Sequence, residues 1–483
     1  MTDSTRPHDP TASAVIALLR DWLPQQRWFA GKGRPLRGAG VVHSLEVVSG
    51  DPALHHMLLR VEHGGTPEHY QLLLGVRETL PPRLAHALIG RLPNGHSLYD
   101  AVHDAELTRW LPERFVAADT VGPLAFHRPG AQAPDPEHVG LVIGAEQSNT
   151  SIIFGDDVIL KLFRRVVPGV NPDLEVSLAL AGAGSRRIPA PIAWFDMPFP
   201  DTDAEPTTLG MLQEYLRTGT DGWELAKTSV RDLYAGQEVR GAGPHAHETG
   251  GDFAGESFRL GAATAEVHAD LARSLPTAVA GRTELAAIAR DMEHRLHAAA
   301  EAVPDLAPFT DRLREAYQDL ETLGRDGHPV PLQRIHGDFH LGQVMRTATR
   351  WVLLDFEGEP ARPLSERRSL HSPLRDIAAM LRSFDYAARH LLAGGGGFWG
   401  RGAPAPHLVR RAEEWATRNR EAFCAGYAEA GSFDPHSEPV LLRAFETDKA
   451  VYEVMYESGN RPSWLPVPMS AIRRLAERAP QPH

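Results

Sequence analysis

The segment Gln333-Arg-Ile-His-Gly-Asp-Phe-His-Leu-Gly-Gln343 is followed by Trp351-Val-Leu-Leu-Asp-Phe-Glu-Gly358, and this pair decides how the chain is interpreted. The second piece is an apolar run that ends on Asp355, so a strand there would project the carboxylate from its end into a cleft. Asp338 stands seventeen residues upstream, in a glycine-containing loop. Two carboxylates on adjacent loops suit phosphoryl transfer, in which one accepts a hydroxyl proton and the other holds Mg²⁺ against nucleotide phosphates.

Either piece alone would also fit a capped strand end with a purely structural role. Their order and spacing together favour the catalytic interpretation. Gln343 adds a side-chain amide oxygen, which is among the hard ligands that Mg²⁺ prefers. The segment therefore predicts Asp338 as the catalytic base and places Gln343 and Asp355 at a magnesium site, while His336 and His340 would orient the loop by hydrogen bonds.

A strand pair that could cover a nucleotide lies earlier in the chain. Residues 150–154 and 158–163 are rich in β-formers and are joined by a Gly-Asp-Asp turn, which predicts a hairpin. Lys161 lies in the middle of the second run, where a lysine is costly unless it is paired. Asn171-Pro172 predicts the start of the next helix, and Glu175 on that helix is the expected partner of Lys161. A surface lysine on an edge strand is the alternative.

The residues before this hairpin have the composition of a phosphate-binding loop. Ser148, Asn149 and Thr150 stand where kinases place a glycine-rich loop. Hydroxyl, amide and backbone N–H groups can hold phosphates without glycines. We therefore expect these three residues to contact the nucleotide.

Composition excludes several classes of protein. The chain has 483 residues and a formal net charge of −12, which disfavours a nucleic-acid binder because phosphate neutralisation needs a basic surface. The one cysteine, Cys424, permits no internal disulfide. No apolar run approaches the length of a membrane span, and the first residues do not resemble a secretory leader. We expect a cytoplasmic protein with no membrane or nucleic-acid partner.

The order of elements predicts an α+β protein with a β-rich first half and a helical second half. Three strand-like runs, at 41–48, 56–62 and 70–76, predict an antiparallel meander. Another strand is expected at 209–215, with short strands near 333–335 and 351–355. Helical spacing marks six long segments in the second half: 256–272, 283–302, 307–324, 373–392, 406–429 and 438–458.

Several segments, taken together, resemble the maltokinase family. They are Gln26–Lys32, Ala145–Ser151, Leu160–Arg165, His336–Gln343, Leu354–Pro360, Ser372–Ala378, Arg382–Ala388 and Asp448–Glu457. The resemblance implies a bilobal protein-kinase-like fold, related to aminoglycoside phosphotransferases, with an additional N-terminal cap and a mostly helical C-lobe. The implied division is 1–92 for the cap, 93–212 for the rest of the N-lobe and 213–483 for the C-lobe.

The resemblance also implies an activity and site residues. The implied reaction is ATP-dependent phosphorylation of maltose to maltose 1-phosphate with Mg²⁺, feeding α-glucan and glycogen synthesis, with a trehalose-to-maltose isomerase as a possible partner. Asp338 would be the base, Gln343 and Asp355 the metal ligands, and Lys161 the phosphate-binding lysine. The hinge against adenine would be Gln213, Glu214 and Tyr215.

One helix of the C-terminal region has the composition of a sugar-binding surface. Lys449, Tyr452, Glu453 and Tyr456 fall at positions i, i+3, i+4 and i+7, so they share one helix face. Aromatic rings cover the apolar face of a sugar while charged groups bind its hydroxyls. The resemblance adds Tyr386 to this set. An ordinary packing helix with satisfied tyrosines is the alternative.

Three other functions stay open at this point. A glucosamine kinase would share the fold and the chemistry and differ only in the acceptor pocket. A direct aminoglycoside kinase would differ in the same way. A catalytically silent kinase-like binding module is disfavoured, because such proteins typically lose one of Lys161, Asp338, Gln343 or Asp355.

Overall fold

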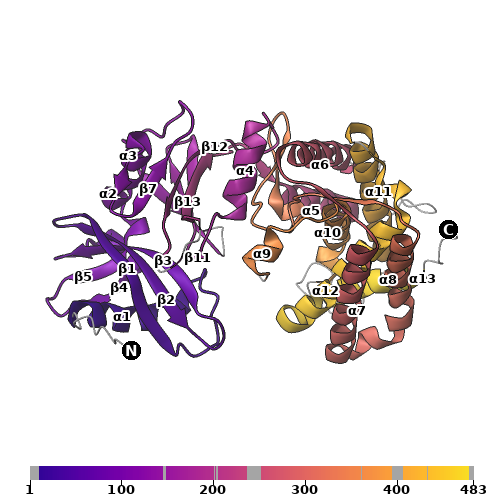
Figure 1. Ribbon diagram of the computed structural model, residues 1–483, viewed down its shortest axis with the longest axis horizontal. Helices are drawn as coiled ribbons and strands as arrows, with labels where there is room; N and C mark the ends of the chain where they lie inside the picture. Colours follow the sequence, from indigo (N-terminus) through magenta and orange to yellow (C-terminus); the bar gives the residue numbers. More distant parts are fainter. Residues whose placement is uncertain are drawn as a thin grey trace. The chain divides into compact units, whose positions relative to one another are not determined.

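A computed structural model describes residues 10–144, 148–200, 202, 205–235, 252–359, 362–393, 406–431 and 433–477 (Figure 1). The chain forms two compact units. The first comprises residues 1–175 and 189–217, and the second comprises 176–188 and 218–483. The β-rich first unit and the helical second unit confirm the expected α+β organisation, whereas the division at residues 92 and 212 stays a prediction.

The first unit begins with a curved antiparallel sheet that confirms the predicted meander (Figure 1). The strand order is β1-β2-β3-β5-β4, and β11 also pairs with β3. Apolar residues on one face pack with Trp28 and Phe29 into a separate core. The elements are α1 (Pro10–Trp22), β1 (Gly38–Val48), β2 (Ala53–Glu62), β3 (Glu68–Arg77), β4 (Leu88–Arg91), β5 (Ser97–Asp100) and β11 (Arg165–Val166).

A second sheet of the same unit carries the predicted hairpin. Its order is β6-β7-β12-β13-β10-β9-β8, and β9 and β10 pair antiparallel with Phe154 opposite Val158. The predicted strand at 209–215 is the central β13. The elements are α2 (Ala105–Thr108), α3 (Trp110–Ala117), β6 (Thr120–Val121), β7 (Leu124–His127), β8 (Gly140–Ile143), β9 (Thr150–Phe154), β10 (Val158–Leu162), β12 (Pro191–Met197) and β13 (Thr207–Glu214).

Helices make up most of the second unit and surround one large apolar core (Figure 1). All six predicted long helices are present. The helices are α5 (Gly222–Ala235), α6 (Ala254–Ser274), α7 (Arg282–Ala302), α8 (Thr310–Arg325), α9 (Leu364–Arg367), α10 (Leu374–Ala393), α11 (Pro406–Ala430), α12 (Pro439–Asn460) and α13 (Pro466–Glu477). None of the helices in the described ranges is long and apolar enough to cross a membrane.

Two short antiparallel arrangements interrupt these helices. One sheet has the order β14 (Thr220–Asp221), β17 (Val344–Arg346) and β18 (Trp351–Leu353), and β15 (Ala278–Ala280) pairs with β16 (Val330–Leu332). The strand predicted near 333–335 is shifted, because β16 ends at Leu332 and Gln333 makes only an isolated bridge to His371. The chain turns away there to begin the loop that carries Asp338.

Two glycines allow α6 and α11 to pack backbone against backbone. A Cβ on Gly261 would lie 2.0 Å from the Phe423 carbonyl oxygen, and one on Gly426 would lie 1.9 Å from the Phe258 carbonyl oxygen. Neither helix can yield by rotating a side chain, since the obstructing atoms belong to the backbone. The close approach of these two helices therefore depends on glycine at both positions.

Gly426→Ala is expected to lower the free energy of unfolding by about 2–3 kcal/mol, since overpacking forces the backbones apart. Urea unfolding measures the loss. Gly459→Ala in α12 is the matched control, because a Cβ there meets nothing within 4 Å; this control should be neutral or slightly stabilising. Equal stabilities of the two variants would contradict the packing argument.

Candidate active site

Lys161 lies near the middle of β10 and is paired within the first unit. Its Nζ is 2.8 Å from an Asp173 carboxylate oxygen, and both side chains are almost fully buried. Asn171 caps α4 (Pro172–Gly182), because its side-chain oxygen accepts a hydrogen bond from the Asp173 N–H at 2.8 Å. The predicted helix start is therefore confirmed. Sequence reasoning missed Asp173 and chose Glu175, whose pairing with Lys161 stays a prediction.

The other residues expected at the nucleotide have varied surroundings within the first unit. Ser148 is exposed, whereas Asn149 and Thr150 are buried. The Thr150 hydroxyl accepts a hydrogen bond from Arg164 at 2.8 Å. The Glu214 N–H donates to the Ala190 carbonyl and the Tyr215 N–H to the Asp157 carbonyl. Gln213, Glu214 and Tyr215 thus stand at the end of β13, shortly before the chain leaves this unit at residue 217.

A buried carboxylate holds the loop that carries Asp338. The two oxygens of Asp376 accept hydrogen bonds from the His336 N–H at 2.7 Å and the Gly337 N–H at 2.9 Å, and His268 Nε2 lies 3.1 Å away. Burial alone would raise the pKa of Asp376, but the contact with His268 and the loop N–H group lower it below the usual value. Asp376 was not predicted as a site residue, although it lies in one of the family-like segments.

The two loop histidines act as expected from the sequence. His336 Nε2 bonds the Leu354 carbonyl at 2.8 Å, so its Nδ1 is the acceptor for the Asp338 N–H at 3.4 Å. His340 Nδ1 accepts from the Gly342 N–H at 3.0 Å, and burial lowers the pKa of this imidazole. Both rings orient the backbone around Asp338, whose own side chain is half-buried. The prediction of an orienting role is confirmed.

Strands β17 and β18 bring the two predicted metal ligands together. Val344 pairs with Leu353, so Gln343 and Asp355 emerge from the same end of this hairpin. The Gln343 side-chain nitrogen lies 3.2 Å from an Asp355 carboxylate oxygen. Asp355 has a left-handed backbone with φ of 63°, which is uncommon for a residue other than glycine and recurs at functional sites.

Glu357 extends this set of oxygen donors. One of its carboxylate oxygens lies within 4.8 Å of an Asp355 oxygen. Sequence reasoning missed Glu357, although its place two residues after Asp355 could have indicated a shared side of an extended segment. An amide and two carboxylates fit Mg²⁺, which prefers hard oxygen ligands.

The residues predicted to bind sugar fall into two groups. Lys449 Nζ lies 4.9 Å from the Tyr452 ring centre, and the Tyr452 ring stacks on that of Tyr456 at 6.3 Å. Glu453 instead turns inward and pairs with Arg382 at 2.7 and 2.9 Å. Tyr386 donates to Glu457 at 3.1 Å. The expected common face therefore holds Lys449, Tyr452 and Tyr456, while Glu453 and Tyr386 belong to a buried polar network.

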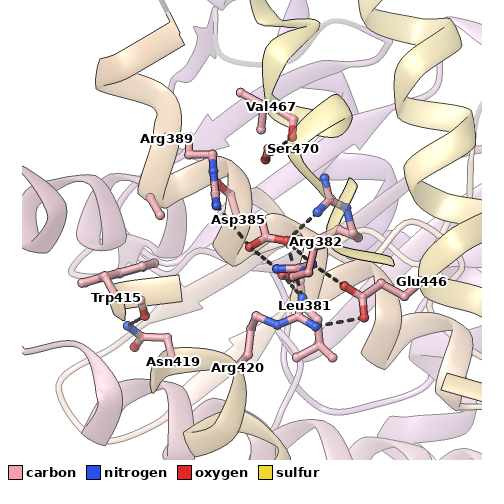
Figure 2. A network of polar contacts seen from close by, with 12 residues as sticks. Leu381, Arg382, Asp385, Arg389, Trp415, Asn419, Arg420, Glu446, Val467 and Ser470 are labelled. Atoms are coloured by element: carbon pink, nitrogen blue, oxygen red, sulfur yellow. Dashed lines mark hydrogen bonds and ion pairs between the residues drawn. The ribbon is translucent and has the colours of Figure 1, made fainter. Parts of the chain in front are cut away.

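That network centres on Asp385 (Figure 2), and it reaches α12 through Glu446 and Glu453. The Asp385 carboxylate pairs with four arginines, namely Arg382, Arg389, Arg420 and Arg474. Arg420 also bonds Glu446 at 2.9 Å. Burial would raise the pKa of Asp385, but the arginines hold it far below the usual range. Arg382 thus links this centre to Glu453.

A pocket that we call the loop pocket lies beside Gly337 and is lined by Lys449 and Tyr452. Its three carboxylates are already engaged. Asp448 bonds Arg295 at 2.9 Å through both oxygens, Glu359 bonds Arg362 at 2.8 Å, and Asp376 holds the loop N–H groups. Burial would raise the pKa of Glu359, but Tyr452 and Arg362 lower it.

Comparisons with known proteins agree with this architecture. Residues 22–104 match the family model of the maltokinase N-terminal cap domain. The glucosamine kinase of Streptacidiphilus jiangxiensis is 28% identical over 361 residues, which cover 72% of this chain and 75% of that protein. The glucosamine kinase of Mycolicibacterium smegmatis is 28% identical over 344 residues, covering 69% and 79%.

A solved structure gives the fold of the whole chain. Glucosamine kinase in complex with glucosamine, ADP and inorganic phosphate aligns with a TM-score of 0.68 at 21% identity, covering 98% of this chain and 99% of that one. This likeness confirms the bilobal kinase-like fold with an N-terminal cap. The fold, the cap match and the curated relatives together support a maltokinase-like kinase.

Proposed function

We propose that this kinase transfers phosphate from ATP to the anomeric hydroxyl of maltose, giving maltose 1-phosphate for α-glucan and glycogen synthesis. The observation that carries the choice of acceptor is the loop pocket, where Lys449 and Tyr452 stand beside the catalytic loop and every carboxylate already has a partner. A neutral disaccharide needs no free carboxylate, so it is compatible with this pocket lining. A cytoplasmic location and a trehalose-to-maltose isomerase as the supplier are part of this proposal.

In this proposal each residue of the site has one task. Asp338 accepts the proton of the attacking hydroxyl, and Asp376 and His336 hold it in place through the loop backbone. Lys161 binds nucleotide phosphates, with Asp173 keeping the ammonium oriented. Gln343, Asp355 and Glu357 would hold Mg²⁺. The bound ion would neutralise charge on the phosphates.

Glucosamine is the second candidate acceptor, because two curated relatives at 28% identity are glucosamine kinases. An ammonium on the sugar would require a carboxylate that is available to it. In the loop pocket this would mean displacing Arg295 or Arg362 from its present partner. Glucosamine would therefore need a free carboxylate in the loop pocket, whereas maltose would not.

Tyr452→Ala is expected to weaken the use of maltose by about 1–3 kcal/mol, which is the cost of leaving polar partners unpaired. The loss should appear mainly in KM, because contacts with sugar hydroxyls form in both ground and transition states. Steady-state kinetics with maltose and glucosamine side by side, with ³¹P NMR of the product, measure it. Met455→Ala, an exposed position on the same helix, is the control.

Two results would overturn the choice of maltose. One is a higher kcat/KM for glucosamine in the wild-type protein, and the other is phosphate on a non-anomeric oxygen. Either result would leave the kinase assignment standing and would move the acceptor to the second candidate.

A further inference from the structure

The loop pocket contains two cations that lack a carboxylate partner. Of its four cationic side chains, Arg295 and Arg362 pair with Asp448 and Glu359. Arg375 and Lys449 do not: within the described ranges no carboxylate oxygen lies within 4.0 Å of either side chain. Lys449 faces the Tyr452 ring instead.

Arg375 is held in a setting whose net effect opposes its charge, although Asp448, Asp376 and Glu359 act in favour of it. Its guanidinium contacts both ring nitrogens of His371 at 3.3 Å. Burial and the Arg375 charge lower the pKa of His371 to about 4, so this imidazole is neutral near pH 7. Arg375 also lies in the first turn of α10, where the helix dipole disfavours a cation. Burial and the neighbouring Arg362 lower the pKa of Arg375 itself.

Keeping the half-buried Arg375 guanidinium charged in these surroundings costs free energy unless an anionic ligand compensates for it. A second hollow continues the loop pocket past Arg375 and shares Gly337, Glu359 and Arg362 with it. The space is therefore open to a group larger than a single water molecule. Its wall offers arginine and lysine donors, and arginine forks match the oxygens of phosphate and carboxylate.

We propose that the loop pocket is an oxyanion site in which Arg375 and Lys449 bind a phosphate group. The phosphate can be carried by the saccharide, at a position away from the reacting hydroxyl, or can be inorganic phosphate. The inference deepens the proposed function and rests on it for the placement of the acceptor beside Lys449 and Tyr452. It gives the acceptor pocket a preference for anionic over cationic sugars.

Equilibrium binding tests this without turnover. Inorganic phosphate is titrated calorimetrically into the full-length protein, in Mg²⁺-free buffer without nucleotide. We expect Arg375→Gln and Lys449→Gln each to weaken binding about tenfold, as for loss of one charged hydrogen bond. Arg290→Gln, an exposed arginine on α7, removes the same charge away from the pocket and should bind as the wild type does.

A second titration separates the two sources of phosphate. Glucose 6-phosphate and glucose are compared in the same variants. Tighter binding of glucose 6-phosphate than of glucose, lost in Arg375→Gln, would assign the site to a saccharide-borne phosphate. Phosphate binding that depends on Arg375 without any advantage for the sugar phosphate would assign it to inorganic phosphate.

Unchanged affinity for both phosphate ligands in both variants would overturn the oxyanion site. Circular dichroism and melting curves establish that the variants are folded, and Lys449→Gln provides the test at a second position should Arg375→Gln not fold. Failure of maltose as an acceptor would be seen only in the turnover assay. The outcome for the proposed function is therefore distinguishable from the outcome for this site.

Discussion

Asp338→Asn is expected to lower kcat by about 10²–10⁴-fold, the usual contribution of a general base, because an amide cannot accept the proton of the attacking hydroxyl. Affinity for ATP should change little, since the proposed role of Asp338 concerns the acceptor. The variant should also fold normally: the loop is held through the backbone N–H groups of His336 and Gly337, which Asp376 binds, and the Asp338 side chain is only half-buried.

Single-turnover kinetics with the acceptor in excess measure the chemical step of this variant directly. Nucleotide binding is measured in parallel by calorimetry. Asp305→Asn, an exposed carboxylate of the same unit, is the matched control and should retain full activity. Turnover by folded Asp338→Asn within a fewfold of the wild type would remove Asp338 from the role of base.

Asp385→Asn is expected to lower the free energy of unfolding by about 3–5 kcal/mol, as for other buried ion pairs that lose one partner. The substitution removes the negative charge on which Arg382, Arg389 and Arg420 converge (Figure 2), and with which Arg474 also pairs. Arg382 also holds Glu453 on α12, the helix that carries Lys449 and Tyr452. Because the substitution loosens this contact, a variant that folds should have a raised KM for the sugar. Asp232→Asn, an exposed carboxylate on α5, is the control and should be neutral.

The stability that the Asp385 carboxylate contributes to the wild-type protein should depend on pH. The arginines hold the folded-state pKa of Asp385 far below the usual value, against the effect of burial. The carboxylate therefore stabilises the fold fully above the pKa of the unfolded chain, about 3.9, and this contribution is lost progressively as the pH falls below it. Urea unfolding at pH 7, 5 and 3.5 should show the gap between wild type and variant narrowing at the lowest pH. A gap that stays constant, or that is below about 1 kcal/mol at pH 7, would contradict this assignment.

The elements themselves were predictable from local sequence. Alternating β-formers around Gly155-Asp156-Asp157 gave the hairpin of β9 and β10, and Asn171-Pro172 marked the start of α4. The spacing between His336 and Asp355 indicated a loop followed by a strand that ends on an acid. Such signals are short-range, because turn residues and side-chain periodicity act within a few residues.

The partners of the charged residues were decided by the tertiary structure alone. Asp173, which sequence reasoning missed, meets Lys161 in the structure, and Asp376 reaches back forty residues to hold His336. Glu453 shares a helix face with Tyr452 in sequence, yet it turns to Arg382, seventy-one residues away. Periodicity specifies which face of a helix a residue occupies but not which other helix packs there. Only packing determines whether a buried carboxylate finds a guanidinium, and so the sequence predicted which residue types form the site while the fold set their partners.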